Sequence, residues 1–217
     1  MLDYGSPFTF LFQDKAWVKK FALACLLTYS LIGAAPALGW MVEIVRRVGR
    51  GEAAALPEWD DWKPFWRLGG QFVSINILWL LPLVLAVIVI YLPLVFANRL
   101  PNETLLAVWG ITLFCVLVFL LLYTIVYSLL FPAMAVLLAV TGSTWQSANP
   151  LRLWQIIHPH FIEYLLVFLI VGLGLFNVTL LLSALTLFLL LPPLLVYMGL
   201  VTAHFAGQLM RMNQFPP

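Results

Sequence analysis

Few side chains in this sequence could do chemistry, and His158, His160 and Glu163 form the closest group of possible metal ligands. A zinc site needs three or four ligands that converge on one point. Pro159 separates the two histidines and leaves them in no fixed helical register, and no fourth ligand lies nearby in the sequence. The sequence therefore predicts no metal site, and it predicts no cofactor.

Motifs of known catalytic centres are also missing. The chain contains no GxSxG, no HExxH and no P-loop. Asp60, Asp61, His158 and His160 could supply the acid and base of a lipid-active enzyme only if folding brought them together. Because no motif provides a nucleophile, we predict a non-enzymatic protein without catalytic residues.

Composition sets the class of protein. The chain has 217 residues, of which 64% are hydrophobic and 9% are charged. A soluble domain carries roughly 25% charged residues, so this chain cannot build an ordinary soluble surface. We predict an all-α integral membrane protein with one membrane domain, 1–217, whose main partner is the lipid bilayer. A net charge of +2 without a basic run gives no reason to expect a nucleic-acid partner.

Apolar runs of about 20 residues define the expected spans, because that length of helix crosses the hydrocarbon core. We expect about four to five transmembrane helices, with spans at 71–98, 104–140, 161–178 and 180–210. The uncharged run from Thr104 to Leu151 is too long to cross once, so we expect a bend near Pro132. The outer turn between the last two spans is expected at Gly172, Gly174, Asn177 and Thr179.

Polar and aromatic segments separate these spans. The segments 56–70 and 141–160 are expected on the cytoplasmic face, because basic residues prefer that side. Residues 1–20 are expected to form another interfacial amphipathic helix. Trp and Phe favour the headgroup level. The expected interfacial anchors are Trp59, Trp62, Phe65, Trp66, Trp145 and Trp154.

Two helix starts can be placed inside these segments. Asp60 or Asp61 is expected to cap a helix that has Pro64 in its first turn. Asn149 is expected to cap a second helix that begins at Pro150. Both expectations depend on the missing hydrogen-bond partners of first-turn N–H groups.

Residues 21–48 allow two interpretations. The segment is apolar over Phe21–Val42, basic residues flank it on both sides, and Gly33-Ala-Ala-Pro36 lies in its middle. It is either a kinked span or a re-entrant hairpin that returns to the same face, with its turn near Gly33–Pro36. The basic flanks favour the hairpin, whereas the short returning limb favours the span.

The C-terminus is expected in the cytoplasm because Arg211 follows the last span. We therefore expect a multi-pass protein of the cell (inner or cytoplasmic) membrane.

A few polar or small residues within the apolar runs remain to be explained. Polar residues inside a membrane are functional candidates by default. An ion pair with Arg46 and Arg47 explains Glu43, and hydrogen bonds between helices explain Asn76 and Asn177. Small residues four apart let two helices approach closely. The expected helix-packing face consists of Gly199, Ala203 and Gly207.

Several short motifs resemble those of an uncharacterised family of multi-span proteins, domain of unknown function 4013. The motifs are Trp17-Val-Lys-Lys20, Pro36-Ala-Leu-Gly39, Arg46-Arg47, Leu56-Pro-Glu-Trp-Asp-Asp-Trp62, Gly69-Gly70 and Ala203-His-Phe-Ala-Gly-Gln208. The resemblance covers most of the chain. It implies a multi-span membrane protein and no particular activity, cofactor or catalytic residue.

Two functions remain open from the sequence. The first is a non-enzymatic accessory subunit of a membrane complex, or a membrane-organising component, with other membrane protein subunits as partners. The second is a small transporter or channel. Aromatic interfacial segments and missing catalytic motifs favour the first.

Overall fold

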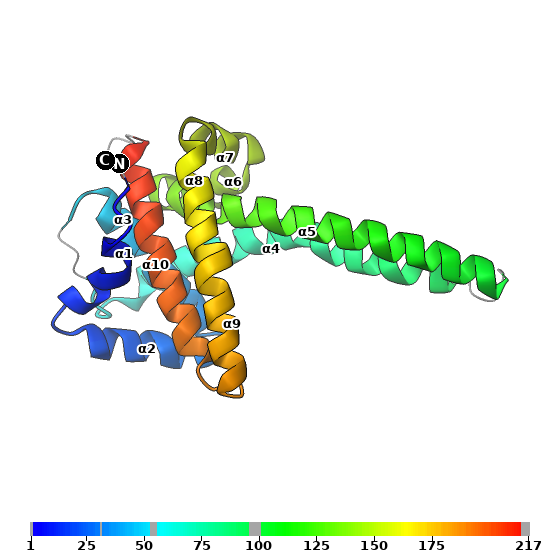
Figure 1. Ribbon diagram of the computed structural model, residues 1–217. Helices are drawn as coiled ribbons and strands as arrows, with labels where there is room; N and C mark the ends of the chain where they lie inside the picture. Colours follow the sequence, from blue (N-terminus) through cyan, green and yellow to red (C-terminus); the bar gives the residue numbers. More distant parts are fainter. Residues whose placement is uncertain (1, 31, 53–55, 96–100, 214–217) are drawn as a thin grey trace. The chain divides into compact units, whose positions relative to one another are not determined.

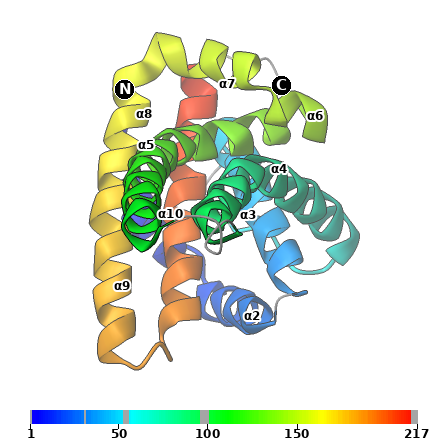
Figure 2. The ribbon, with the colours of Figure 1, turned by 90° about the vertical axis from the view of Figure 1, so that its right-hand side faces the viewer.

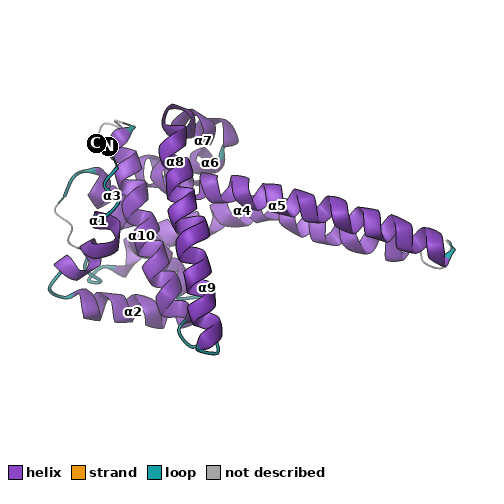
Figure 3. Ribbon diagram, viewed as in Figure 1, coloured by secondary structure: helices purple, strands orange, loops and turns teal. Residues whose placement is uncertain are grey.

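The computed structural model describes residues 2–30, 32–52, 56–95 and 101–213, which form helices and turns. None of these described residues forms a strand, which confirms the predicted all-α class (Figure 3). The chain divides into two compact units. The larger unit consists of Met1–Ile75 and Leu129–Pro217, and the hairpin unit consists of Asn76–Ser128.

The N-terminal part of the larger unit differs from the single helix expected over residues 1–20. It forms a short helix, α1 (Ser6–Thr9), and a 3-10 turn, η1 (Phe10–Gln13). Asp14 then adopts an extended backbone, and its carboxylate accepts a hydrogen bond from the backbone N–H of Ala16 at 2.7 Å. This local bond competes with helix formation, as Asp side chains commonly do.

Residues 17–49 form two helices, α2 (Trp17–Tyr29) and α3 (Ala34–Gly49). Ser30 is extended, and its hydroxyl accepts a hydrogen bond from the N–H of Gly33 at 3.0 Å. The break ends at Gly33, the first residue of the Gly33–Pro36 stretch where the hairpin interpretation expects its turn, and Ala34–Pro36 already belong to α3. Whether the segment crosses the membrane stays a prediction.

Two long helices follow, α4 (Trp62–Val95) and α5 (Asn102–Thr141). As predicted, the carboxylate of Asp61 caps α4 by accepting the N–H of Lys63 at 3.0 Å, and Pro64 lies in the first turn. Pro132 lies inside α5, and the helix continues through it to Thr141.

The segment 141–160 contains α6 (Thr144–Ala148), α7 (Pro150–Ile157) and the 3-10 turn η3 (His158–His160). The predicted cap of α7 is confirmed, because the side chain of Asn149 accepts the N–H of Leu151 at 2.9 Å.

The turn between the last two apolar stretches lies further along the chain than expected. The helix continues through α8 (Phe161–Val167), the π-helix η4 (Phe168–Leu175) and α9 (Phe176–Leu185). Gly172 and Gly174 lie within the π-helix rather than in a turn. The side-chain amide of Asn177 donates to the carbonyl of Leu173, one turn earlier in the same helical stretch, at 2.5 Å. The chain reverses instead at Leu187 and Phe188, which have positive φ, before α10 (Leu191–Met212).

Helix α10 forms the centre of the larger unit (Figures 1 and 2). It packs most extensively on α3, and it also contacts α1, α2, α8, η4 and α9. Trp40 of α3 and Leu200, Phe205 and Leu209 of α10 are fully buried. The core of this unit therefore lies around the contact between α3 and α10.

The hairpin unit contains the later part of α4 and the earlier part of α5. The hydroxyl of Tyr127 donates to the side-chain oxygen of Asn76, and the hydroxyl of Tyr123 donates to the carbonyl of Trp79. Most of the Leu, Ile and Val side chains in this unit are exposed.

Four helical stretches are long and apolar enough to cross a membrane: Trp62–Val95, Asn102–Thr141, Pro150–Leu185 and Leu191–Met212. Neither α2 nor α3 is among them. The chain is therefore an all-α polytopic membrane protein, and exposed apolar side chains on these stretches suit a lipid environment.

Candidate functional site

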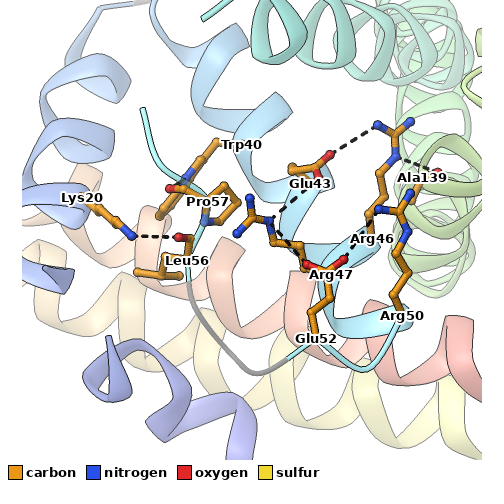
Figure 4. A network of polar contacts seen from close by, with 10 residues as sticks. All are labelled: Lys20, Trp40, Glu43, Arg46, Arg47, Arg50, Glu52, Leu56, Pro57 and Ala139. Carbon is orange, nitrogen blue, oxygen red and sulfur yellow. Dashed lines mark hydrogen bonds and ion pairs between the residues drawn. The ribbon is translucent and has the colours of Figure 1, made fainter. Parts of the chain in front are cut away.

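Residues 56–61, which precede α4, form a non-helical strap that Asp14 and Lys20 hold in place within the larger unit. The ammonium of Lys20 donates to the carbonyl of Leu56 at 2.8 Å (Figure 4). One carboxylate oxygen of Asp14 accepts the N–H of Leu56 at 3.1 Å. Lys20 also pairs with Asp14 at 2.8 Å and with Glu58 at 2.6 Å. An ammonium has three donors, and all three have a partner here.

Burial and pairing oppose each other in this cluster. Burial by itself raises the pKa of Asp14, but hydrogen bonds from Lys20, Ala16 and Leu56 outweigh it and the pKa falls below its ordinary value. Burial by itself lowers the pKa of Lys20, but its bonds to Asp14 and Glu58 outweigh it and the pKa rises. Both groups therefore stay charged at neutral pH, as a structural ion pair.

The rest of the strap covers Trp40 of α3. The indole N–H of Trp40 donates to the carbonyl of Pro57 at 3.0 Å (Figure 4). Trp59 stacks on Trp40 with ring centroids 5.1 Å apart, and Phe65 meets Trp59 edge to face at 5.3 Å. Trp59 and Phe65 are thus packed in this unit, although both were expected to be interfacial anchors.

Helices α3 and α4 approach each other closely at Gly39 and Gly69. A Cβ added to Gly39 would lie 1.9 Å from the carbonyl oxygen of Phe65, and one added to Gly69 would lie 1.7 Å from that of Ala35. No side chain fits at either position. Both glycines belong to short motifs of the sequence, but nothing in the sequence pairs them.

The face of Gly199, Ala203 and Gly207 lies within the core of the larger unit. A Cβ on Gly199 would lie 2.6 Å from the sulfur of Met41, and one on Gly207 would lie 2.5 Å from the Cβ of Val48. Ala203 is 4% exposed. These contacts are with α3 of the same chain, which is the geometry that small residues permit.

The C-terminal end of α3 carries a cluster of charged side chains (Figure 4). Glu43 pairs with Arg46 at 3.3 Å and with Arg47 at 4.0 Å, which confirms the ion pair expected at this helix end. The guanidinium of Arg46 also donates to the carbonyl of Ala139 at 2.8 Å. Arg46 is therefore fixed between α3 and the end of α5.

Two cavities of the larger unit border α3. The first, of about 390 Å³, has a mixed lining: the polar side chains of Arg46, Asp61, Lys63, Arg67 and Gln71, and the apolar residues Pro64, Leu68 and Gly142. We call it the basic cleft. The second, of about 270 Å³, lies among α2, α3, α10 and the adjoining turns of α4 and α5, with an almost entirely apolar lining that includes Met41, Phe72 and Leu195. We call it the apolar cavity.

Most of the remaining expected anchors are exposed. Trp66, Trp145 and Trp154 all present large exposed surfaces, and Trp62 is partly exposed. Such side chains suit the headgroup level of a bilayer. Their role as anchors stays a prediction.

Among the residues that the structure describes, no group of three His, Cys, Asp or Glu side chains is placed to hold a metal ion. His204 instead packs against Phe10 with ring centroids 4.7 Å apart and lies 3.2 Å from the amide of Gln208. The bond between Asn76 and Tyr127 is the inter-helix hydrogen bond expected for Asn76.

The basic cleft and the Lys20 cluster were missed by reasoning from the sequence. The cleft combines residues from α3, α4 and the turn after α5, and Lys20 joins Asp14 to Glu58 across a loop. The only signal was the density of charge in Leu56–Gly70, which did not identify partners.

A family model described as "Protein of unknown function (DUF4013)" matches residues 22–187, which is well over half of the chain. No curated protein and no solved structure matches the chain.

Proposed function

We propose that this chain, which belongs to the DUF4013 family of proteins of unknown function, is a non-enzymatic membrane component. It would act through contacts with other membrane constituents, as an accessory subunit of a complex or as an organiser of the membrane around it.

The observation that carries this proposal is the almost entirely apolar lining of the apolar cavity. Its lining contains no charged side chain among the described residues. Its two hydroxyl groups, Thr28 and Thr202, each donate to a carbonyl of their own helix, at 2.8 and 2.7 Å. Paths for ions and polar solutes are lined by charged side chains, free carbonyls or other polar groups. The cavity therefore supports an interaction role over a transport role.

Two experiments on the full chain separate this proposal from the transporter alternative. The tagged protein is purified from its own membrane in a mild detergent, and its mass is measured by native mass spectrometry. The pure protein is also reconstituted into liposomes and assayed for movement of ions and of small fluorescent solutes. We expect a stoichiometric second subunit or tightly retained lipid, and no movement above that of protein-free liposomes.

A matched variant makes the second experiment decisive. Ala34 lines the apolar cavity, so Ala34→Phe should fill part of it. Movement of a solute by the unaltered protein that Ala34→Phe abolishes, with folding retained, would overturn the proposal and establish the transporter.

A further inference from the structure

The basic cleft gathers side chains from three parts of the larger unit. Arg46 comes from α3, Lys63 and Arg67 come from the first two turns of α4, and Gly142 follows α5. Gln71 closes one side by donating to the carbonyl of Gly142 at 2.9 Å. The cleft holds about 390 Å³, which is within the range of sites for small ligands, roughly 300–1,000 Å³.

Positive side chains outnumber negative ones in the lining of the cleft. Asp61 is the acid in its lining, and one of its oxygens is engaged in capping α4. Arg46 is partly neutralised by Glu43. Among the described residues, no acid lies within ion-pair distance of Lys63 or Arg67. The N-terminal end of α4 adds further positive potential, because its first N–H groups point outward along the helix axis.

The position of the cleft along α4 matches the headgroup level of a bilayer. The uncharged run of α4 begins just after Arg67, so Lys63 and Arg67 are the last charged residues before it. Trp62 and Trp66, in the same two turns, are 36% and 44% exposed. Partly exposed Trp beside basic residues at the start of a span marks the membrane–water boundary. A ligand held here lies where lipid phosphates lie.

We propose that the basic cleft binds the phosphate group of an anionic phospholipid. Arg67 and Lys63 would donate to the phosphate oxygens, with Arg46, fixed by Glu43 and Ala139, supplying a third positive charge. Basic pockets between membrane helices are known to hold anionic headgroups. This inference is independent of the proposed function, because a subunit, an organiser or a transporter can each carry a bound lipid.

The test measures lipid binding to the delipidated full chain in detergent by native mass spectrometry. The probes are phosphatidylglycerol, phosphatidylcholine of the same acyl chains, and inorganic phosphate as competitor. The variants are Lys63→Gln, Arg67→Gln and the double change. Lys15→Gln and Lys19→Gln remove the same charge from exposed positions outside the cleft.

We expect phosphatidylglycerol to bind more tightly than phosphatidylcholine. Each cleft variant should weaken phosphatidylglycerol binding about fivefold, and the double change about 25-fold, on the basis of the usual contribution of one basic residue near an anionic surface. Lys15→Gln and Lys19→Gln should leave the affinity within about twofold. The melting temperature of each variant checks that folding is retained, and the charge reversal Lys63→Glu provides a second test if the double variant unfolds.

Three outcomes would overturn the proposal. Equal affinity for the two lipids would show that the phosphate of an anionic headgroup is not recognised. An equal loss in the cleft variants and in the Lys15 and Lys19 variants would show general attraction by surface charge. Displacement of phosphatidylglycerol by inorganic phosphate at equal affinity would assign the cleft to a soluble phosphate rather than to a lipid.

Discussion

The two units differ in how closely their helices pack around glycine residues. In the larger unit, Gly69 lies so close to α3 that an added Cβ would be 1.7 Å from a backbone oxygen. In the hairpin unit, a Cβ added to Gly110 would meet nothing within 4 Å. Lys20, Trp40 and Ala203 are buried in the first unit, whereas most side chains of the second face outward.

This contrast shows where the sequence specifies a particular structure. Lipid tails are as apolar as leucine, so apolar side chains alone give membrane helices little reason to choose one partner over another. Close backbone approach and polar links provide that choice in the larger unit. The hairpin unit has little more than its length, its apolar surface and its few polar links between α4 and α5.

The largest expected effect comes from adding one methyl group at the glycine contact. Gly69→Ala should destabilise the protein by on the order of 4 kcal/mol or more, because the new methyl group would collide with the backbone of Ala35, which cannot rotate away. Gly110→Ala should instead be neutral or stabilising by about 0.5–1 kcal/mol, since alanine favours helix. Unfolding by SDS in mixed micelles measures both.

Gly70→Ala is the nearest control, because a Cβ at this position meets nothing within 4 Å. If Gly69→Ala and Gly70→Ala had the same effect, the close contact between α3 and α4 would be wrong.

The next effect concerns the buried ion pair. Lys20→Met leaves the carboxylate of Asp14 buried without its cation, and removal of one partner of such a pair costs about 3–5 kcal/mol. Lys19→Met changes an exposed lysine and should cost less than about 0.5 kcal/mol. The midpoint of thermal unfolding, followed by tryptophan fluorescence, compares the two.

The pH dependence of this pair follows from its pKa shifts. The pKa of Asp14 is lowered, so its contribution is complete above the ordinary value of 3.8 and disappears as the pH falls through the folded-state value below it. The pKa of Lys20 is raised, so its contribution is complete below 10.5 and disappears at higher pH. The difference between the unaltered protein and a variant without either titrating group, Asp14→Asn with Lys20→Met, should therefore be constant near neutral pH and shrink below pH 3.8 and above pH 10.5. A difference that changes between pH 5 and 9 would contradict this assignment.

The sequence predicted features whose causes are local. Asp61 and Asn149 were identifiable as caps because a cap and its N–H partner are two residues apart. Composition and run length sufficed for the all-α membrane class. The contact of Gly39 with Gly69 and the pairing of Lys20 with Glu58 depend on how distant segments meet, which no local pattern encodes.

The turn between α9 and α10 shows a different limit of prediction from sequence. Gly172 and Gly174 are typical turn residues, yet they lie in a π-helix, and the reversal occurs at Leu187 and Phe188. Residues with positive φ are usually Gly or Asn, so turn composition pointed to the wrong place. The Pro192-Pro193 pair, which lies in the first turn of α10, marks the position of the chain reversal more closely than the glycines do.

The third effect tests the face of α10 against α3. Ala203→Leu should destabilise the protein by about 2 kcal/mol, because a larger side chain holds apart two helices that pack closely. Ala107→Leu makes the same change at an exposed position of the hairpin unit and should have little effect. Thermal stability and oligomeric state, measured by size-exclusion chromatography, distinguish the two. Equal stability of both variants would mean that Ala203 faces lipid rather than α3.

The smallest expected effect sharpens the account of the hairpin unit. Tyr127→Phe removes the hydroxyl that donates to Asn76 and links α4 to α5. Hydrogen bonds between membrane helices contribute about 0.6 kcal/mol on average, because the separated helices also find partners, so the loss should be of that size. Tyr91→Phe removes an exposed hydroxyl from the same unit and is the matched control. Unfolding free energies from SDS titration should place Tyr127→Phe below Tyr91→Phe by about 0.6 kcal/mol. If the two were equal, the pairing of α4 with α5 in this unit would not depend on the Asn76 link, and apolar contact together with the bond from Tyr123 to Trp79 would hold it.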